Sequence, residues 1–307
     1  LTEEPEYEIP VAKALVQRYE NRIEHDSIQD ISTSQLHPFE YHPRESQTVR
    51  NFGGDNVPRV IADLSLENEI TRQTLNKLGY TYFEAEDKWG IGDFACDYIF
   101  VNKKRVDFDI PGTLGIIQAY SVWIEGKKTN IYPFLDAKQY LNNPHLHLEL
   151  NFIYTTLPEL SAGLIRQLNN DSTAVLLIDT YNEHGMAEQR RLFMELMAKN
   201  CNVPVVIGRA YGDLTPENLQ LHSATDIGSL LIDGLGDGVF IAAENCGSLE
   251  HGNQTAFGIL QASRTRISKT EYISCPSCGR TLFDLQETTA LVRNRTSHLK
   301  GIKIGIM

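Results

Sequence analysis

The stretch Ala174-Val175-Leu176-Leu177-Ile178-Asp179 decides the fold class, together with the amphipathic run Met186–Lys199 that follows it. Its five consecutive apolar residues have the length of a strand that is buried on both faces, and an acidic residue ends the run. The second run repeats its apolar positions with the period of a helix. A buried strand followed by a helix is one β/α unit, so the sequence predicts a parallel sheet covered by helices.

The same alternation continues on both sides, and about seven or eight β/α units fit between Pro58 and Ser274. Further predicted strands are Val60–Leu64, Tyr98–Val101, Leu146–Tyr154, Val203–Ile207, Ser229–Asp233, Gly238–Ala242 and Glu271–Ser274. Predicted helices are Val11–Arg22, Glu67–Leu78, Pro158–Leu168, Gln254–Ser263 and one capped by Thr215 with Pro216 at its first position. The expected fold is therefore α/β, a TIM-like (β/α) barrel, with an open doubly wound sheet as the alternative. Residues 26–58, which contain prolines and glycines and show little periodicity, are expected to form a loop, either a flexible linker or an irregular excursion.

Composition excludes several classes of protein. The 307 residues are 41% hydrophobic and 22% charged, which is ordinary for a globular protein, and no apolar run reaches the length of a membrane span. Five cysteines do not make a dense disulfide framework. The net charge of −12 argues against binding nucleic acid through the whole surface. We therefore expect neither a nucleic-acid nor a membrane partner.

The charge is distributed unevenly. The segment Ser263–Met307 holds eight basic and three acidic residues, a net charge of +5, whereas the first 262 residues carry −17. The change of sign predicts a second module near Ser263 that faces an anionic partner, and a solvated basic segment is the alternative.

Two acidic residues are candidates for chemistry because active sites in parallel barrels lie at the carboxyl ends of the strands. Asp179 and Asp233 each follow a predicted strand. The glycine-rich run Gly234–Gly238 after Asp233 could bring backbone amides to a phosphate, or it could simply form a tight turn.

Two other groups of residues suggest metal chemistry. His145, His147 and Glu149 alternate along a predicted strand and would share one face, as metal ligands or as solvent-facing polar residues. Cys275 and Cys278 form a Cys-x-x-Cys pair followed by Arg280, a residue that favours thiolates. With His298 the pair gives three zinc ligands at most, and an iron–sulfur cluster needs about four. The remaining thiols, Cys96, Cys201 and Cys246, are expected to be buried and structural.

The sequence from Thr270 to Glu287, TEYISCPSCGRTLFDLQE, resembles the start of the iron–sulfur domain of the (E)-4-hydroxy-3-methylbut-2-enyl diphosphate synthases, enzymes of the non-mevalonate isoprenoid pathway. The similarity continues through Thr296–Leu299 and Ile302–Met307. Leu1–Pro5 resembles the end of the family's substrate-binding barrel, and Leu230–Val239 is similar to the domain inserted in the long, three-domain form. The resemblance therefore implies the long form.

The family's reaction is a two-electron reductive opening and dehydroxylation of 2-C-methyl-D-erythritol 2,4-cyclodiphosphate at a [4Fe-4S] cluster. By this resemblance, ferredoxin or flavodoxin is the electron donor and the cyclic diphosphate is the substrate. Only Cys275 and Cys278 match cluster ligands of the family, and no catalytic residue is carried over. The implied location is the cytoplasm in bacteria and the plastid stroma in plants. The oligomeric state is left open, and a homodimer is one of the states considered.

The resemblance divides the chain into three parts: residues 1–25, the end of the substrate barrel and a linker helix; 26–265, the inserted TIM-like barrel; and 266–307, the first part of the [4Fe-4S] domain. The chain begins without methionine and ends before the family's third cysteine and its glutamate ligand, so we expect an inactive fragment that holds essentially no cluster. The insert is expected to be a structural spacer. The alternative is a non-catalytic docking module with a zinc-binding Cys-x-x-Cys tail.

Overall fold

The computed structural model describes residues 5–20, 22, 31, 36–37, 39–126, 130–142, 145–274, 283–299 and 301–306. They belong to two compact units. One unit is Gln29–Arg266, and the other combines Leu1–Ile28 with Ile267–Met307.

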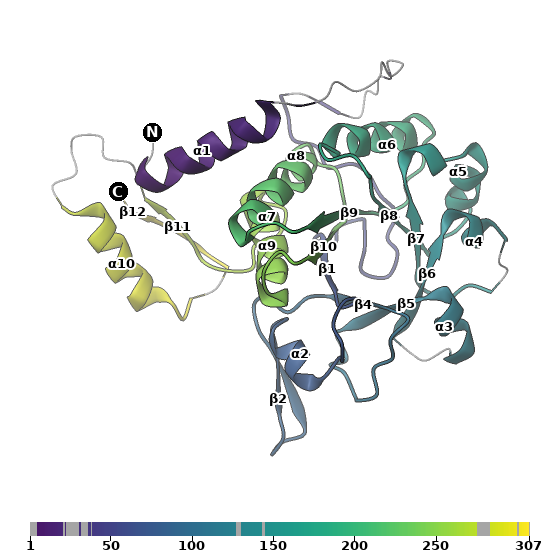
Figure 1. The fold of residues 1–307 in the computed structure, drawn as a ribbon, viewed down its shortest axis with the longest axis horizontal. Helices are drawn as coiled ribbons and strands as arrows, with labels where there is room; N and C mark the ends of the chain where they lie inside the picture. The colour runs from purple at the N-terminus through teal and green to yellow at the C-terminus, as the bar shows by residue number, and fades with distance from the viewer. Residues whose placement is uncertain are drawn as a thin grey trace. The chain divides into compact units, whose positions relative to one another are not determined.

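The larger unit is a closed barrel of eight parallel strands in the order β1-β10-β9-β8-β7-β6-β5-β4 (Figure 1). Every strand pairs with two neighbours, with one register shift between β4 and β5, and Arg59 of β1 pairs with Gly238 of β10 to close the circle. The TIM-like barrel is thus confirmed, and closure excludes the open sheet. The barrel strands are β1 Arg59–Asp63, β4 Tyr98–Asn102, β5 Gly115–Ala119, β6 Ile131–Asp136, β7 Asn151–Thr155, β8 Ala174–Ile178, β9 Val205–Gly212 and β10 Gly238–Glu244.

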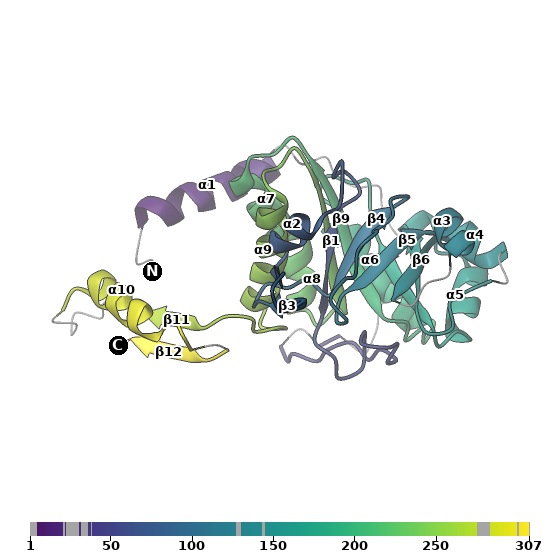
Figure 2. The ribbon, with the colours of Figure 1, turned by 90° about the horizontal axis from the view of Figure 1, so that it is seen from below.

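Helices follow most of these strands and cover the outside of the barrel (Figures 1 and 2). Residues 103–114, between β4 and β5, contain no helix. Thr215 caps α7 by accepting a hydrogen bond from the Asn218 amide, as predicted. The helical elements of this unit are α2 Arg72–Asn76, α3 Tyr120–Gly126, α4 Ala137–Asn142, the 3-10 turn η1 Leu157–Glu159, α5 Ala162–Asn169, α6 Met186–Ala198, α7 Pro216–Ser223, the π-helical turn η2 Ala224–Gly228, α8 Ser229–Ile232 and α9 Leu249–Ala262.

Several predicted elements were wrong. Ser229–Asp233 is not a strand: its apolar residues form α8, which buries Leu230 and Leu231 and exposes Ile232. A run of four apolar or small residues has no period of its own, so local sequence cannot separate a strand from a helical turn here. Glu271–Ser274 is a strand, but it does not belong to the barrel. The places of these two segments among the barrel strands are taken by β5 and β6, which were not predicted.

Between α2 and β4 the chain forms an antiparallel hairpin outside the barrel, made of β2 Tyr80–Phe83 and β3 Lys88–Ile91. Trp89 packs against Tyr82, with 5.0 Å between the ring centroids, and its indole nitrogen donates to the Asp109 carbonyl at 3.1 Å. The hairpin therefore attaches to the helix-free connection between β4 and β5.

The segment before β1 closes the base of the barrel. Val49 and Phe52 form a backbone bridge and are buried among the residues that fill the barrel interior. Asn51 receives hydrogen bonds from Arg59 and Tyr98, the first residues of β1 and β4, so the segment lies at the amino ends of the strands. Residues 39–58 lack regular strands and helices, as predicted, but the part around Val49 and Phe52 is packed inside the barrel, so it is a plug and not a linker.

The smaller unit contains α1 Pro5–Glu20 and a β-α-β segment made of β11 Glu271–Ser274, α10 Leu285–Thr296 and β12 Lys303–Ile306 (Figure 2). β11 and β12 pair in parallel. α10 packs on β11, where the hydroxyls of Tyr272 and Thr296 are 2.7 Å apart and Arg293 lies over the Tyr272 ring. This small parallel pair needs a crossover, and α10 provides it.

Candidate functional site

Asp179 lies where the sequence placed it, at the carboxyl end of β8. Its carboxylate accepts a hydrogen bond from the Thr180 amide at 2.8 Å and one from Tyr154, a residue of β7. Burial raises the pKa of Asp179, while these hydrogen bonds and the charge of Arg209 lower it. The carboxylate is therefore held at the mouth of the barrel.

Asp233 lies elsewhere, because the strand predicted before it is a helix. It ends α8, receives a hydrogen bond from Arg190 of α6, and lies in a connection that leads into the amino end of β10. A connection that enters a strand lies at the base of a parallel barrel, so Asp179 and Asp233 do not share a site.

The glycine-rich run after Asp233 forms a tight turn. Gly234 and Gly236 have φ values of 77° and 104°, and a Cβ on Gly234 would lie 2.5 Å from the His42 carbonyl oxygen. The Leu235 and Asp237 amides donate to the carbonyls of Leu230 and Val205, so they are engaged within the protein. The Asp237 carboxylate beside them, which accepts from Ser46 at 2.6 Å, further disfavours a phosphate.

His145, His147 and Glu149 do not alternate on a strand, because β7 begins only at Asn151. The His147 ring nitrogen Nδ1 accepts from the Glu149 amide at 3.1 Å, and the Glu149 carboxylate pairs with Arg50 at 3.2 Å. Across the described part of the chain, no group of three histidine, cysteine or acidic residues is placed to hold a metal. The three residues are therefore not arranged as metal ligands, and the metal interpretation of this triplet was wrong.

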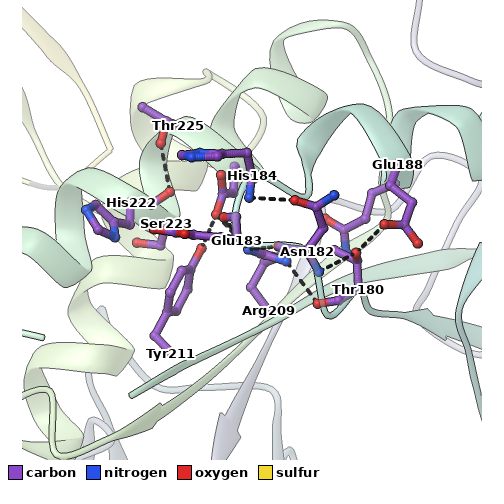
Figure 3. A network of polar contacts seen from close by, with 12 residues as sticks. Thr180, Asn182, Glu183, His184, Glu188, Arg209, Tyr211, His222, Ser223 and Thr225 are labelled. Carbon is purple, nitrogen blue, oxygen red and sulfur yellow. Dashed lines mark hydrogen bonds and ion pairs between the residues drawn. The ribbon is translucent and has the colours of Figure 1, made fainter. Parts of the chain in front are cut away.

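The sequence did not reveal a polar network that surrounds Arg209 of β9 (Figure 3). The Arg209 guanidinium donates to three carbonyls of the loop after β8, at 3.0 to 3.1 Å, those of Thr180, Asn182 and Glu183. On its other side it pairs with Asp226, at 3.1 Å. The exposed fractions of the two side chains are 3% and 0%. Arg209 therefore ties the loop after β8 to the π-helical turn.

Asp226 also accepts a hydrogen bond from the Tyr211 hydroxyl at 2.9 Å. Burial alone would lower the pKa of Arg209, but Tyr211 and Asp226 raise it above its ordinary value. Because Arg209 is held in its charged form and its donors face protein acceptors, the network is structural. π-Helical turns often occur at functional sites, but this one is occupied by an internal ion pair.

Aromatic side chains fill the interior of the barrel toward the carboxyl ends of its strands. Phe100, Phe134, Tyr154 and Phe240 pack around one another, with ring centroids 4.9 to 5.9 Å apart. Asp179 lies beside this layer, with Tyr154 as a hydrogen-bond partner and Arg209 and Glu188 as charged neighbours.

Cys275, Cys278 and Arg280 lie outside the described residues, which resume on either side with β11 and α10. The other three cysteines are buried free thiols of the barrel unit, as expected. Burial raises the pKa of Cys96 and of Cys201, which makes them poor metal ligands. The thiols that remain for a metal are those of Cys275 and Cys278, the right chemistry for an iron–sulfur cluster but too few for one.

No helix in the described ranges has both the length and the apolar character needed to cross a membrane.

Curated proteins similar to this chain include several 4-hydroxy-3-methylbut-2-en-1-yl diphosphate synthases, and no protein-family model matches the chain. The chain is 37% identical over 313 residues to 4-hydroxy-3-methylbut-2-en-1-yl diphosphate synthase (flavodoxin) of Parabacteroides distasonis, and 37% identical over 310 residues to the protein of that name from Bacteroides thetaiotaomicron. Each alignment includes 100% of the chain and 46% of the relative. The chloroplastic (ferredoxin) form of Arabidopsis thaliana is 44% identical over 144 residues, which are 45% of the chain and 19% of the relative.

The chain thus spans about half the length of the bacterial relatives it matches. The similarity includes the barrel as well as the Cys-x-x-Cys segment, because the alignment covers the whole chain. The resemblance noted in the sequence is confirmed: along its whole length the chain is homologous to part of the 4-hydroxy-3-methylbut-2-en-1-yl diphosphate synthases.

Proposed function

We propose that this chain provides the inserted barrel and the first part of the iron–sulfur domain of a 4-hydroxy-3-methylbut-2-en-1-yl diphosphate synthase. The observation that carries the proposal is the alignment of the whole chain to 46% of relatives with that name. The assignment is residues 1–25 to the end of a substrate barrel, 26–265 to the insert and 266–307 to the iron–sulfur domain. The compact units described above, with a boundary after Arg266, support the last division.

In the complete protein the proposed activity is the reductive opening and dehydroxylation of 2-C-methyl-D-erythritol 2,4-cyclodiphosphate. The names of the relatives support flavodoxin or ferredoxin as the electron donor. A [4Fe-4S] cluster, when bound, would deliver those electrons one at a time, and Cys275 and Cys278 would be two of its ligands. The proposed location is the cytoplasm in bacteria and the plastid stroma in plants, and the chloroplastic form of Arabidopsis thaliana supports the plant location.

We expect the 307-residue chain by itself to be inactive and to retain no stable cluster. Its remaining cysteines are buried in the barrel, so two thiols cannot meet the requirement for about four ligands. The measurement is anaerobic reconstitution with iron and sulfide, followed by visible absorption and metal analysis. A stable brown chromophore would contradict the expectation, and one equivalent of zinc lost on replacing His298 would favour the zinc tail instead.

The barrel itself is proposed to be a spacer that separates the domains that bind substrate and cluster. The aromatic layer and the saturated Arg209 network support this role, since neither offers a group to a substrate. Asp179→Asn and Asp233→Asn, each made in the complete enzyme, should therefore leave kcat within about twofold of wild type. The check is steady-state turnover with the cyclic diphosphate and a chemical reductant. A loss of turnover above about tenfold in a folded Asp179 variant would refute the spacer role.

A further inference from the structure

A cavity of about 400 Å³ lies at the carboxyl ends of β1 and β10, beside the first turns of α9. This is the first and last strand pair of the barrel, where the circle closes. Its size is within the range of cavities that bind small molecules. The polar side chains lining it include Asp63, Glu67, Glu244 and Asn253.

The cavity is acidic. Three carboxylates line it and no basic side chain does. Lys104 lies close to Asp63, and its ammonium donates to the Leu64 and Ser65 carbonyls. Burial raises the pKa of Asp63 overall, while the charge of Lys104 lowers it. Lys104 therefore offsets part of the negative charge of one of the three carboxylates, and the cavity favours a positively charged occupant.

A buried acceptor adds an independent requirement. Asn253 of α9 is 4% exposed, and its amide nitrogen donates to the Phe94 carbonyl at 2.7 Å. That bond fixes the orientation of the amide, and the Asn253 Oδ1 atom has no hydrogen-bond partner among the described residues. A buried acceptor without a donor is costly, so an occupant that brought an N–H or O–H group to Asn253 Oδ1 would relieve this cost.

The start of a helix normally attracts an anion, but α9 does not offer that site here. The Ser248 hydroxyl already accepts from the His251 amide, and the carboxylates of Asp63 and Glu244 would repel a phosphate. A metal ion is also disfavoured, since no three acidic, histidine or cysteine groups converge within the described residues. The remaining class is an organic cation with N–H donors.

Apolar side chains form the rest of the wall, and they suit a hydrocarbon stem. Ile61, Ile241 and Leu249 lie beside the carboxylates. We propose that this cavity binds a small aliphatic amine, with its ammonium group against the acidic side of the cavity and its methylene chain against the apolar wall. The proposal concerns the barrel alone and does not depend on the activity of the complete enzyme.

Gly252 offers a way to fill the cavity without disturbing the fold. It lines the cavity, has ordinary helical backbone geometry, and a Cβ at this position would meet no atom within 4 Å. Gly258, on the same helix and outside the cavity, has equally open surroundings. Gly252→Leu and Gly258→Leu are therefore a matched pair, of which only the first occupies the binding space.

The test is isothermal titration of the 307-residue chain with putrescine at low ionic strength, with 1-butanol and ammonium as separate probes. We expect saturable one-to-one binding of putrescine, stronger than that of either probe, which lack the charge or the stem. Gly252→Leu should weaken binding at least about tenfold, with unchanged circular dichroism, and Gly258→Leu should not. Asp63→Asn should weaken it, while Glu250→Gln, which removes an α9 charge outside the cavity, should not.

Three results would overturn the proposal. The first is the absence of saturable binding of putrescine. The second is equal weakening in Gly252→Leu and Gly258→Leu, or in Asp63→Asn and Glu250→Gln, which would indicate general attraction to an acidic surface. The third is tighter binding of Mg²⁺ that displaces putrescine, which would make the cavity a metal site.

Discussion

Replacing Arg209 with leucine is expected to lower the free energy of unfolding of the barrel by about 3–5 kcal/mol. The substitution leaves the Asp226 carboxylate, which is fully buried, without its cation. It also removes the donors to three loop carbonyls, those of Thr180, Asn182 and Glu183. An uncompensated buried charge is among the most costly defects in a folded protein, so this effect should exceed that of an ordinary cavity.

Urea unfolding followed by tryptophan fluorescence measures this loss in the barrel alone, because Trp89 and Trp123 both belong to the barrel unit. Arg105→Leu is the matched control, since it removes an arginine whose partner Glu125 is as exposed as itself. The control should cost less than about 1 kcal/mol. The double variant Arg209→Leu with Asp226→Leu should recover part of the loss, because it removes both charges together. A loss below about 1 kcal/mol in Arg209→Leu would contradict the structural role assigned to the pair.

Local sequence predicted the parts of this fold that carry their own signal. The strand Ala174–Ile178 is apolar at every position, and its helix repeats with the helical period, so both are where the pattern placed them. The Thr215-Pro216 cap is equally local. These elements were sufficient for the class of fold because a βα repeat leaves few alternatives.

The elements that were missed lack such a signal. β6 contains Pro133, and β5 runs into α3 without a break, so neither shows a bounded apolar run. The error at Ser229–Asp233 then placed Asp233 at the wrong end of the barrel. A misassigned element of five residues thus moved a candidate site from one end of the barrel to the other.

The candidate sites show the same division between local and distant information. Arg209 and Asp226 are 17 residues apart and come from a strand and a π-helical turn, so no motif joins them. The Cys275–Cys278 pair is a local motif and was found at once, but its resemblance to a family supplied its interpretation. The cavity beside α9 unites residues of the first and last strands, a contact that only closure of the barrel creates.

The substitution Phe52→Ala tests whether residues 39–58 form a plug that packs inside the barrel or a linker. We expect it to lower the free energy of unfolding of the barrel by about 3–5 kcal/mol, the range for a buried phenylalanine. Phe52 is 0% exposed, and its ring lies 5.1 Å from that of Tyr98 and 5.6 Å from that of Phe152, measured between centroids. These rings come from β4 and β7, on different sides of the barrel, so the plug joins strands that do not pair directly.

The same fluorescence-detected urea unfolding measures this effect, with Phe39→Ala as the matched control. Phe39 belongs to the same segment and is 92% exposed, so its loss should change stability by less than about 0.5 kcal/mol. Phe52→Leu should cost less than the alanine variant, because leucine refills part of the space. If the segment were a linker, both phenylalanines would give small and equal effects. A plug therefore predicts a loss in the free energy of unfolding that occurs at position 52 alone and grows as the side chain becomes smaller. Only a side chain packed against the strands gives such a dependence on its size.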